Sequence, residues 1–294
     1  MTSCRYCHMA GVLISLALVT LTSWGWDTTR SATSNIQKEL PFKAGATVWV
    51  IAEFQDVTIT VKPISSVKVD VVQEATDFDA KSKLAEYLPT FVQLGGNVFI
   101  YVNKTKERLE PAELENKRLP DCVIGPARPG IFGRVSVEMP PGMNVSVITF
   151  SGRCNFKGDL GDAAVRFQTN TGRIEIEGAM QDLQTQTTYE RVAVRLTRHI
   201  HSAEVGIDRG KVELDGSADS ISVHSNSANV AVILPRAWAG TGKIETVSGG
   251  IRLQDIAGSK GQDNNHMSIL GDSDGPKCTI KTGSGSILLK RNVV

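Results

Sequence analysis

Hydrophobic and polar residues alternate in short runs over most of the chain after residue 35. Period-two alternation places successive side chains on opposite sides of an extended backbone, so it predicts half-buried β-strands. In the first half of the chain, the pattern predicts consecutive strands at Thr47–Ile51, Val57–Val61 and Val67–Val71, a hairpin over Phe91–Val102, and a strand pair at Arg134–Glu138 and Asn144–Ile148.

Only one segment of the first half has helical spacing. Phe78, Leu84 and Leu88 recur at helical intervals within Asp77–Leu88, and Pro89 ends the pattern. Residues 103–130 are charged, rich in proline and without a period, so we expect a loop there. Residues 36–150 are therefore predicted to form a β-rich domain with one short helix.

Residues 151–294 contain an internal repeat. Gly172–Gly178 reads GRIEIEG, and Gly210–Gly216 reads GKVELDG 38 residues later. Alignment on the central apolar pair shows a step of about 18–20 residues. The aligned pairs are Cys154/Phe156, Ile174/Ile176, Val192/Val194, Val212/Leu214, Val230/Val232, Ile251/Leu253 and Ile287/Leu289, with Met267/Ile269 in the gap before the last.

A fixed period near 20 residues is typical of a β-solenoid, because one unit has too few apolar residues to bury a core and stacked units share one. Weaker apolar pairs lie between the main ones, so each unit holds two short strands. We predict an all-β fold, a β-helix-like solenoid of about seven coils preceded by the β-rich region. The alternative is an antiparallel stack or sandwich of the same strands.

The N-terminus carries an export pattern. Met9–Leu21 is an uncharged apolar run that follows Arg5 and precedes the small-residue site Ser23-Trp24-Gly25. This order predicts a secretory signal peptide. The run extended to Trp26 is also long enough for a short membrane anchor, which is the alternative for residues 1–26. Either interpretation places the rest of the chain across a membrane.

A family resemblance rests on the turns and their spacing. Phe42–Val48, Pro140-Pro141-Gly142 before Asn144–Gly152, and the repeated Thr-x-Thr-Gly, Val-Ser-Gly and Thr-Gly-Ser-Gly units resemble the bacterial putative-adhesin family called domain of unknown function 4097. The similarity covers roughly residues 40–292. It implies an exported β-repeat fold with an adhesin-like role, and it implies no catalytic residue.

Charge and cysteine content narrow the classes of function. There are 32 Lys and Arg against 31 Asp and Glu, a net charge of +1, which argues against a general nucleic-acid binder. Cys4–His8 matches the haem-attachment string C-x-x-C-H, but its place before the export signal favours chance. Cys154 and Cys278 lie in apolar alternation and are predicted to be buried thiols, whereas the state of Cys122 stays open.

The repeat alignment places Arg153, Arg173, Arg191 and Lys211 in one outward row. This row is the predicted binding site, a basic stripe for an anionic envelope polymer or a lipid head group. In the alternative interpretation, Glu175 and Glu213 on the same face neutralise the row. Glu177, Arg195 and Asp215 would form a second, salt-bridged row.

The acids and the histidines also suggest two kinds of chemistry, glycoside hydrolysis and metal binding. Glu175 with Glu213, or Glu177 with Asp215, would stand about 10 Å apart, within the range of a glycosidase pair. Acids recur at these outward positions from repeat to repeat and do not converge in a pocket, so catalysis is disfavoured. His199 and His201 would share a face, with His224 as a conceivable third metal ligand, but a surface pair is the simpler interpretation.

We therefore expect an exported, non-enzymatic envelope or surface protein without cofactor or metal. Its partner would be an envelope polymer, a lipid head group or a protein. The alternatives are a membrane-anchored envelope sensor or scaffold and, less favoured, a glycan-active β-helix enzyme. The sequence leaves the ligand, the oligomeric state and the handedness of the coils open.

Overall fold

The computed structural model describes residues 31–76, 79–104, 109–116, 130–256, 258–263 and 265–292. The expected signal or anchor at 1–26 and Cys122 lie outside these residues. No helix in the described part is long and apolar enough to cross a membrane. The expected all-β class is confirmed, since strands dominate and the two described helices are short.

The strands form two faces that run along the same long axis. Face A consists, in spatial order, of β5 (Thr90–Leu94), β6 (Asn97–Val102), β2 (Thr47–Ala52), β8 (Asn144–Ser151), β10 (Ala164–Thr171), β12 (Asp182–Tyr189), the first parts of β14 (Ile200–Asp215) and β15 (Ala218–Leu234), β20 (Lys277–Ser284), β16 (Thr241–Ser248), β19 (His266–Ile269) and β18 (Ser259–Asp263).

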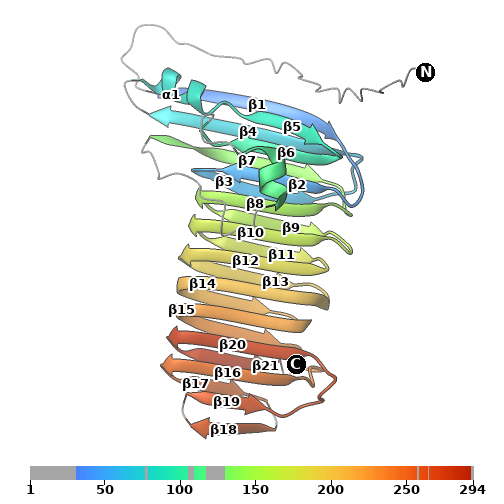
Figure 1. Cartoon of the computed structure of the whole chain (residues 1–294), viewed down its shortest axis with the longest axis vertical. Coiled ribbons are helices and arrows are strands. Elements are labelled where there is room, and N and C mark those ends of the chain that lie inside the picture. The colour runs from blue at the N-terminus through green and yellow to red at the C-terminus, as the bar shows by residue number, and fades with distance from the viewer. Residues whose placement is uncertain are drawn as a thin grey trace, which may run out of the picture.

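Face B lies behind it and is built in the same way. Its order is β1 (Ser31–Pro41), β4 (Ser66–Thr76), β7 (Ile131–Met139), β3 (Gln55–Val61), β9 (Cys154–Asp159), β11 (Ile174–Ala179), β13 (Arg191–Leu196), the second parts of β14 and β15, β21 (Ile287–Arg291) and β17 (Ile251–Gln254). Figure 1 shows the resulting elongated stack, which ends at β1 and β4 on one side and at β18 and β19 on the other.

The central strands pair in parallel, and their partners along the chain are 18 to 20 residues apart. Ile174 pairs with Val192, Val192 with Val212, and Val212 with Val230. The apolar pairs found in the sequence therefore point inward, and one core cluster runs from Leu40 to Leu289. Burial of each such side chain contributes about 1.5–3 kcal/mol, and stacking lets short strands share this gain.

The order of the layers differs from the order of the chain at both ends. Ile287 and Leu289 pair with Val230 and Val232, so β21 lies between β15 and β17 although β17 precedes it in the chain. Met267 belongs to an antiparallel strand beside β16. Likewise β2 lies between β6 and β8. Apolar periodicity identifies which residues of a unit point inward. It cannot identify which unit stacks on which, because every unit has the same pattern of inward apolar residues.

The predicted strands of the first half match β2, β3 and β4, and the predicted hairpin matches β5 and β6. The two strands expected on either side of Pro140 are present as β7 and β8, but they do not pair with each other, because β7 lies on face B and β8 on face A. The expected helix corresponds to α1 (Ala80–Glu86). A second helix, α2 (Pro111–Asn116), lies within the stretch expected to be a loop.

The corners that lead from face A to face B explain the repeated glycines. Gly210 has φ +132°, and a Cβ there would lie 1.8 Å from the carbonyl oxygen of Glu190 in the layer before. Glycine is the only residue without a Cβ, so it permits both this backbone angle and this close stacking. Glu190 occupies the same corner position one layer earlier with φ +90°, which is strained for a residue with a side chain.

Candidate functional site

The four predicted basic residues do form one row on face B. Each of them directly precedes one of Cys154, Ile174, Val192 and Val212, which are neighbours across β9, β11, β13 and β14. Arg191 and Lys211 are direct register partners. The structure therefore brings Arg153, Arg173, Arg191 and Lys211 together as the alignment predicted, while their role in binding stays a prediction.

Carboxylates on the same face engage most of this row. Arg173 forms an ion pair with Glu175, and both Arg191 and Lys211 form ion pairs with Glu213. Hydrogen bonds from Lys211, and then from Arg191, hold the pKa of Glu213 below its usual value. This arrangement agrees with the alternative interpretation, in which interspersed acids neutralise the row.

The second row on face B is also an ion-pair ladder. Glu177 lies 3.8 Å from Lys157 and 3.5 Å from Arg195, measured between the charged atoms. Of the four acids expected as glycosidase candidates, Glu175, Glu177 and Glu213 are thus engaged by cations, and Asp215 is the register partner of Arg195. A general acid needs a raised pKa, whereas the cations beside Glu213 lower its pKa, so Glu213 is a poor proton donor.

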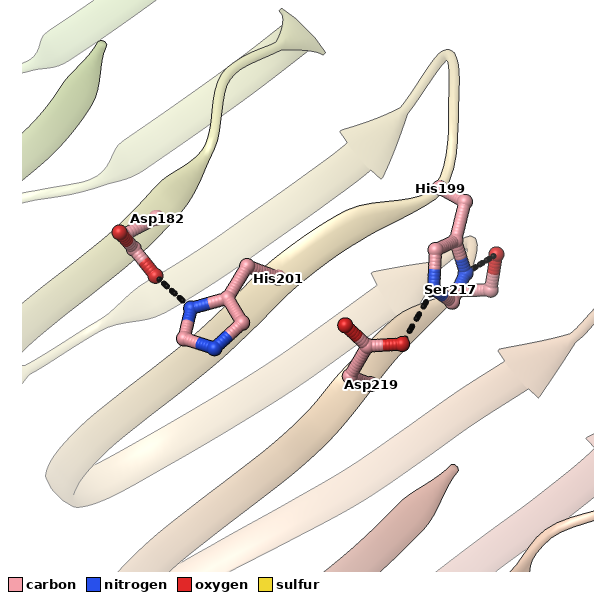
Figure 2. Close-up of polar contacts among 5 residues, drawn as sticks. All are labelled: Asp182, His199, His201, Ser217 and Asp219. Atoms are coloured by element: carbon pink, nitrogen blue, oxygen red, sulfur yellow. Dashed lines mark hydrogen bonds and ion pairs between the residues drawn. The ribbon is translucent and has the colours of Figure 1, made fainter. Parts of the chain in front are cut away.

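The histidines lie at the edge of face A, each with its own aspartate (Figure 2). His199 Nε2 is 2.8 Å from Asp219 Oδ1, and His199 Nδ1 is 3.0 Å from Ser217 Oγ. His201 Nδ1 is 2.8 Å from Asp182 Oδ1. Within the described residues, no three potential metal ligands cluster. His224 contacts Ser222 instead, 2.8 Å away.

The pairing of His201 with Asp182 changes the pKa of both groups. The hydrogen bond to Asp182 raises the pKa of His201. Burial by itself raises the pKa of Asp182, but hydrogen bonds from Ser202 and His201 outweigh it, so the pKa is lowered overall. Both shifts favour the ionised pair. The sequence did not point to these aspartates because they lie about one repeat away from their histidines.

Ser217, His199 and Asp219 form a hydrogen-bonded chain that resembles a serine hydrolase triad. In a working triad the aspartate is buried and orients the histidine. Here the side chain of Asp219 is 64% exposed and that of His199 is 50% exposed. This hydrogen-bonded chain therefore lacks the buried carboxylate that a serine hydrolase needs.

An open groove of about 930 Å³ crosses the outer side of face A toward its C-terminal end. Its floor follows one register row, Gln186, Gly206, His224, Lys281 and Glu245, over β12, β14, β15, β20 and β16. Asn226, Asn265 and Thr188 also line it. Sequence patterns do not predict this groove, because its residues come from six separated segments and β20 is inserted out of chain order.

Toward the N-terminal end, the outer side of face A is apolar and covered. Trp49, Phe99 and Tyr101 lie side by side on β2 and β6, with the rings of Trp49 and Phe99 6.1 Å apart. Leu114 of α2 packs on this cluster and is 1% exposed. The aromatic cluster is thus closed, and the open part of face A is its polar half.

The two described cysteines are buried free thiols, as expected. Burial raises the pKa of Cys278 to about 12 and also raises the pKa of Cys154. Thiols that stay protonated at neutral pH are poor nucleophiles and poor metal ligands, so these side chains belong to the core.

No family model and no curated protein matches the sequence. Similar solved structures include a putative adhesin from Bacteroides fragilis, with a TM-score of 0.46, 10% identity, and coverage of 87% of this chain and 96% of that chain. A putative cell adhesion protein from Clostridium sporogenes has a TM-score of 0.37 and 9% identity, covering 88% and 100%. A putative lipid binding protein from Parabacteroides distasonis has a TM-score of 0.28 and 13% identity, covering 87% and 96%.

Two of these proteins have adhesin or cell adhesion names, and those names describe the neighbours alone. The narrower assignment to domain of unknown function 4097 has no matching family model. At such low identities and TM-scores, the similarities assign neither a ligand nor a binding residue to this chain.

Proposed function

We propose that the chain is an exported, non-enzymatic surface protein of the adhesin type, folded as a two-faced β-solenoid, which binds an extended polymer or protein along face A. The observation that carries the proposal is the open groove of about 930 Å³ over five adjacent strands. Small-molecule sites are enclosed, mostly apolar pockets, whereas an open, elongated polar groove fits a chain-like partner.

Two features support the solenoid part of the proposal. The parallel ladders repeat at 18 to 20 residues on both faces, and the inward pairs form continuous columns. β14 and β15 run through the corner from face A to face B without a break. A stack of this kind gives long regular faces, which suit extended partners.

The ionic networks support a non-enzymatic role. Glu175, Glu177 and Glu213 on face B are in ion pairs, and the triad-like chain at His199 is solvent-exposed. The export pattern in residues 1–26 is the basis for proposing export. Whether this segment is a cleaved signal or a membrane anchor is a separate question. The mass of the exported protein would distinguish an adhesin with a removed signal from an anchored sensor or scaffold.

The test is co-sedimentation of the protein with isolated cell-envelope material from the organism that makes it. Gly206→Tyr fills the groove floor, and a Cβ at Gly206 has only ordinary contacts, 3.6 Å from the Thr185 carbonyl oxygen and 3.8 Å from Gln186 Cγ. We expect this variant to fold and to bind at least tenfold more weakly. Gly206→Ala is the matched control and should bind like the wild type.

Two face B variants locate the surface. Ala193→Tyr fills the corresponding outward position between Glu175 and Glu213, and the combined Arg173→Glu, Arg191→Glu and Lys211→Glu protein reverses the basic row. Both should retain binding. Loss of binding in these variants, with Gly206→Tyr unaffected, would overturn the assignment to face A and identify the basic row as the contact. Absence of binding by every variant and the wild type would overturn the adhesin role.

A further inference from the structure

We propose that the ligand of the face A groove is a neutral, hydroxyl-rich glycan. This inference rests on the proposed function and names its ligand class. The groove lining includes Gln186, Asn226 and Asn265, which carry side-chain amides, and Thr188, which carries a hydroxyl. An amide offers both donors and acceptors, and a sugar hydroxyl is also both, so the two kinds of group are complementary.

The charged groups in and beside the groove are balanced in number, with Glu245 and Asp208 against Lys243 and Lys281. Glu245 lies 2.6 Å from Lys243 Nζ and 3.2 Å from Lys281 Nζ. Hydrogen bonds from these lysines hold the pKa of Glu245 below its usual value, so the acid stays ionised and balances them. Asp208 accepts a hydrogen bond from the Asn226 amide. An anionic ligand is recognised by unbalanced cations, which this arrangement does not favour.

The repeat of the groove suits a polymer. Neighbouring strands lie about 4.8 Å apart, so equivalent side chains recur at that spacing over about 19 Å along the axis. That spacing is close to the length of one sugar unit in an extended glycan. Each layer can therefore present its polar groups to a successive unit of the chain.

A peptide fits the groove less well. Extended peptides gain affinity mainly by adding a strand to a free sheet edge. The strands under the groove, β14, β15 and β20, are hydrogen-bonded on both sides within face A. Their backbone groups are engaged, so recognition must come from the outward side chains, most of which are polar.

The experiment uses the full chain and envelope material divided into three parts. One part is untreated, one is oxidised with periodate, which cleaves vicinal diols of sugars, and one is digested with protease. We expect binding to fall at least tenfold after periodate and to survive protease. Binding of the wild type should also change less than twofold between low and high salt, because a neutral ligand has no charge to screen.

Gly206→Tyr and Gly206→Ala are the matched pair in each arm. Loss of binding after protease, with resistance to periodate, would overturn the glycan and identify a protein partner, while the proposed surface role would stand. A steep fall of binding with salt would overturn the neutral ligand in favour of an anionic one. Equal binding by Gly206→Tyr and the wild type in every arm would overturn the groove itself, and with it the proposed function.

Discussion

Faces A and B have similar interiors and different exteriors. Phe167 on face A and Phe156 on face B both point into the shared core, with 0% and 2% exposure. On the outside, face B carries rows of mutually paired acids and bases, whereas face A carries a polar groove and the histidine–aspartate edge. The shared core requires apolar residues at the inward positions of both faces, and it leaves the outward positions free to differ between them.

The largest effect is expected where the faces are alike. Phe167→Ala and Phe156→Ala should each lower the free energy of unfolding by about 3–5 kcal/mol, because each leaves a cavity in a packed core. Val247→Ala, at a side chain that is 79% exposed, is the control and should change it by less than about 0.5 kcal/mol. Chemical denaturation measures all three. A much smaller effect on one face would contradict the shared core.

Substitutions at the corner between the faces should change the free energy of unfolding by an intermediate amount, and two of them should act in opposite directions. Glu190→Gly should raise the free energy of unfolding by about 1 kcal/mol, because glycine adopts φ +90° without steric strain. Gly210→Ala should lower it, since the new Cβ would collide with the Glu190 carbonyl oxygen. The same denaturation experiment applies. Destabilisation by Glu190→Gly would show that the glutamate side chain stabilises the corner.

The smallest expected effect is a pH-dependent change in stability at the outer side of face A. His201 has a raised pKa, so its contribution to stability is complete below its ordinary value of 6.5 and is lost as pH rises through the raised value. Asp182 has a lowered pKa, so its contribution is present above 3.8 and is lost as pH falls through the lowered value. The pair is strongest between these limits. His201→Gln should lower the melting temperature more at about pH 5.5 than at about pH 9.

Glu213→Gln on face B is the matched control for the pH experiment. The lowered pKa of Glu213 keeps the carboxylate ionised at both pH values, so the melting temperature should fall by a similar small amount at each. Equal pH dependence of the two variants would argue against an ionised His201–Asp182 pair on face A.

The pattern of residues along the chain was sufficient to predict features that depend on a single strand or turn. Alternation identified the inward pairs from Cys154 to Leu289, because the side-chain period of a strand is two. The spacing of the repeats correctly placed the basic row, since parallel neighbours stay in register from layer to layer. It also placed Glu175 and Glu213 near that row.

Local pattern was insufficient where segments from different layers meet. The groove combines residues from Gln186 to Lys281, and it depends on the insertion of β20 between β15 and β16. The partners of His199 and His201 come from adjacent layers. The cover of Leu114 over Trp49 depends on the position of α2.

The sequence by itself determined the all-β class, the inward columns and the rows of charge on face B, because these follow from period two and a constant repeat. Only the tertiary structure decided which layers are neighbours, which charges are neutralised and where the outer surface is hollow. The physical reason is that inward Val, Ile and Leu columns are nearly interchangeable between layers. The order of stacking is therefore a property of the whole chain and not of any one repeat.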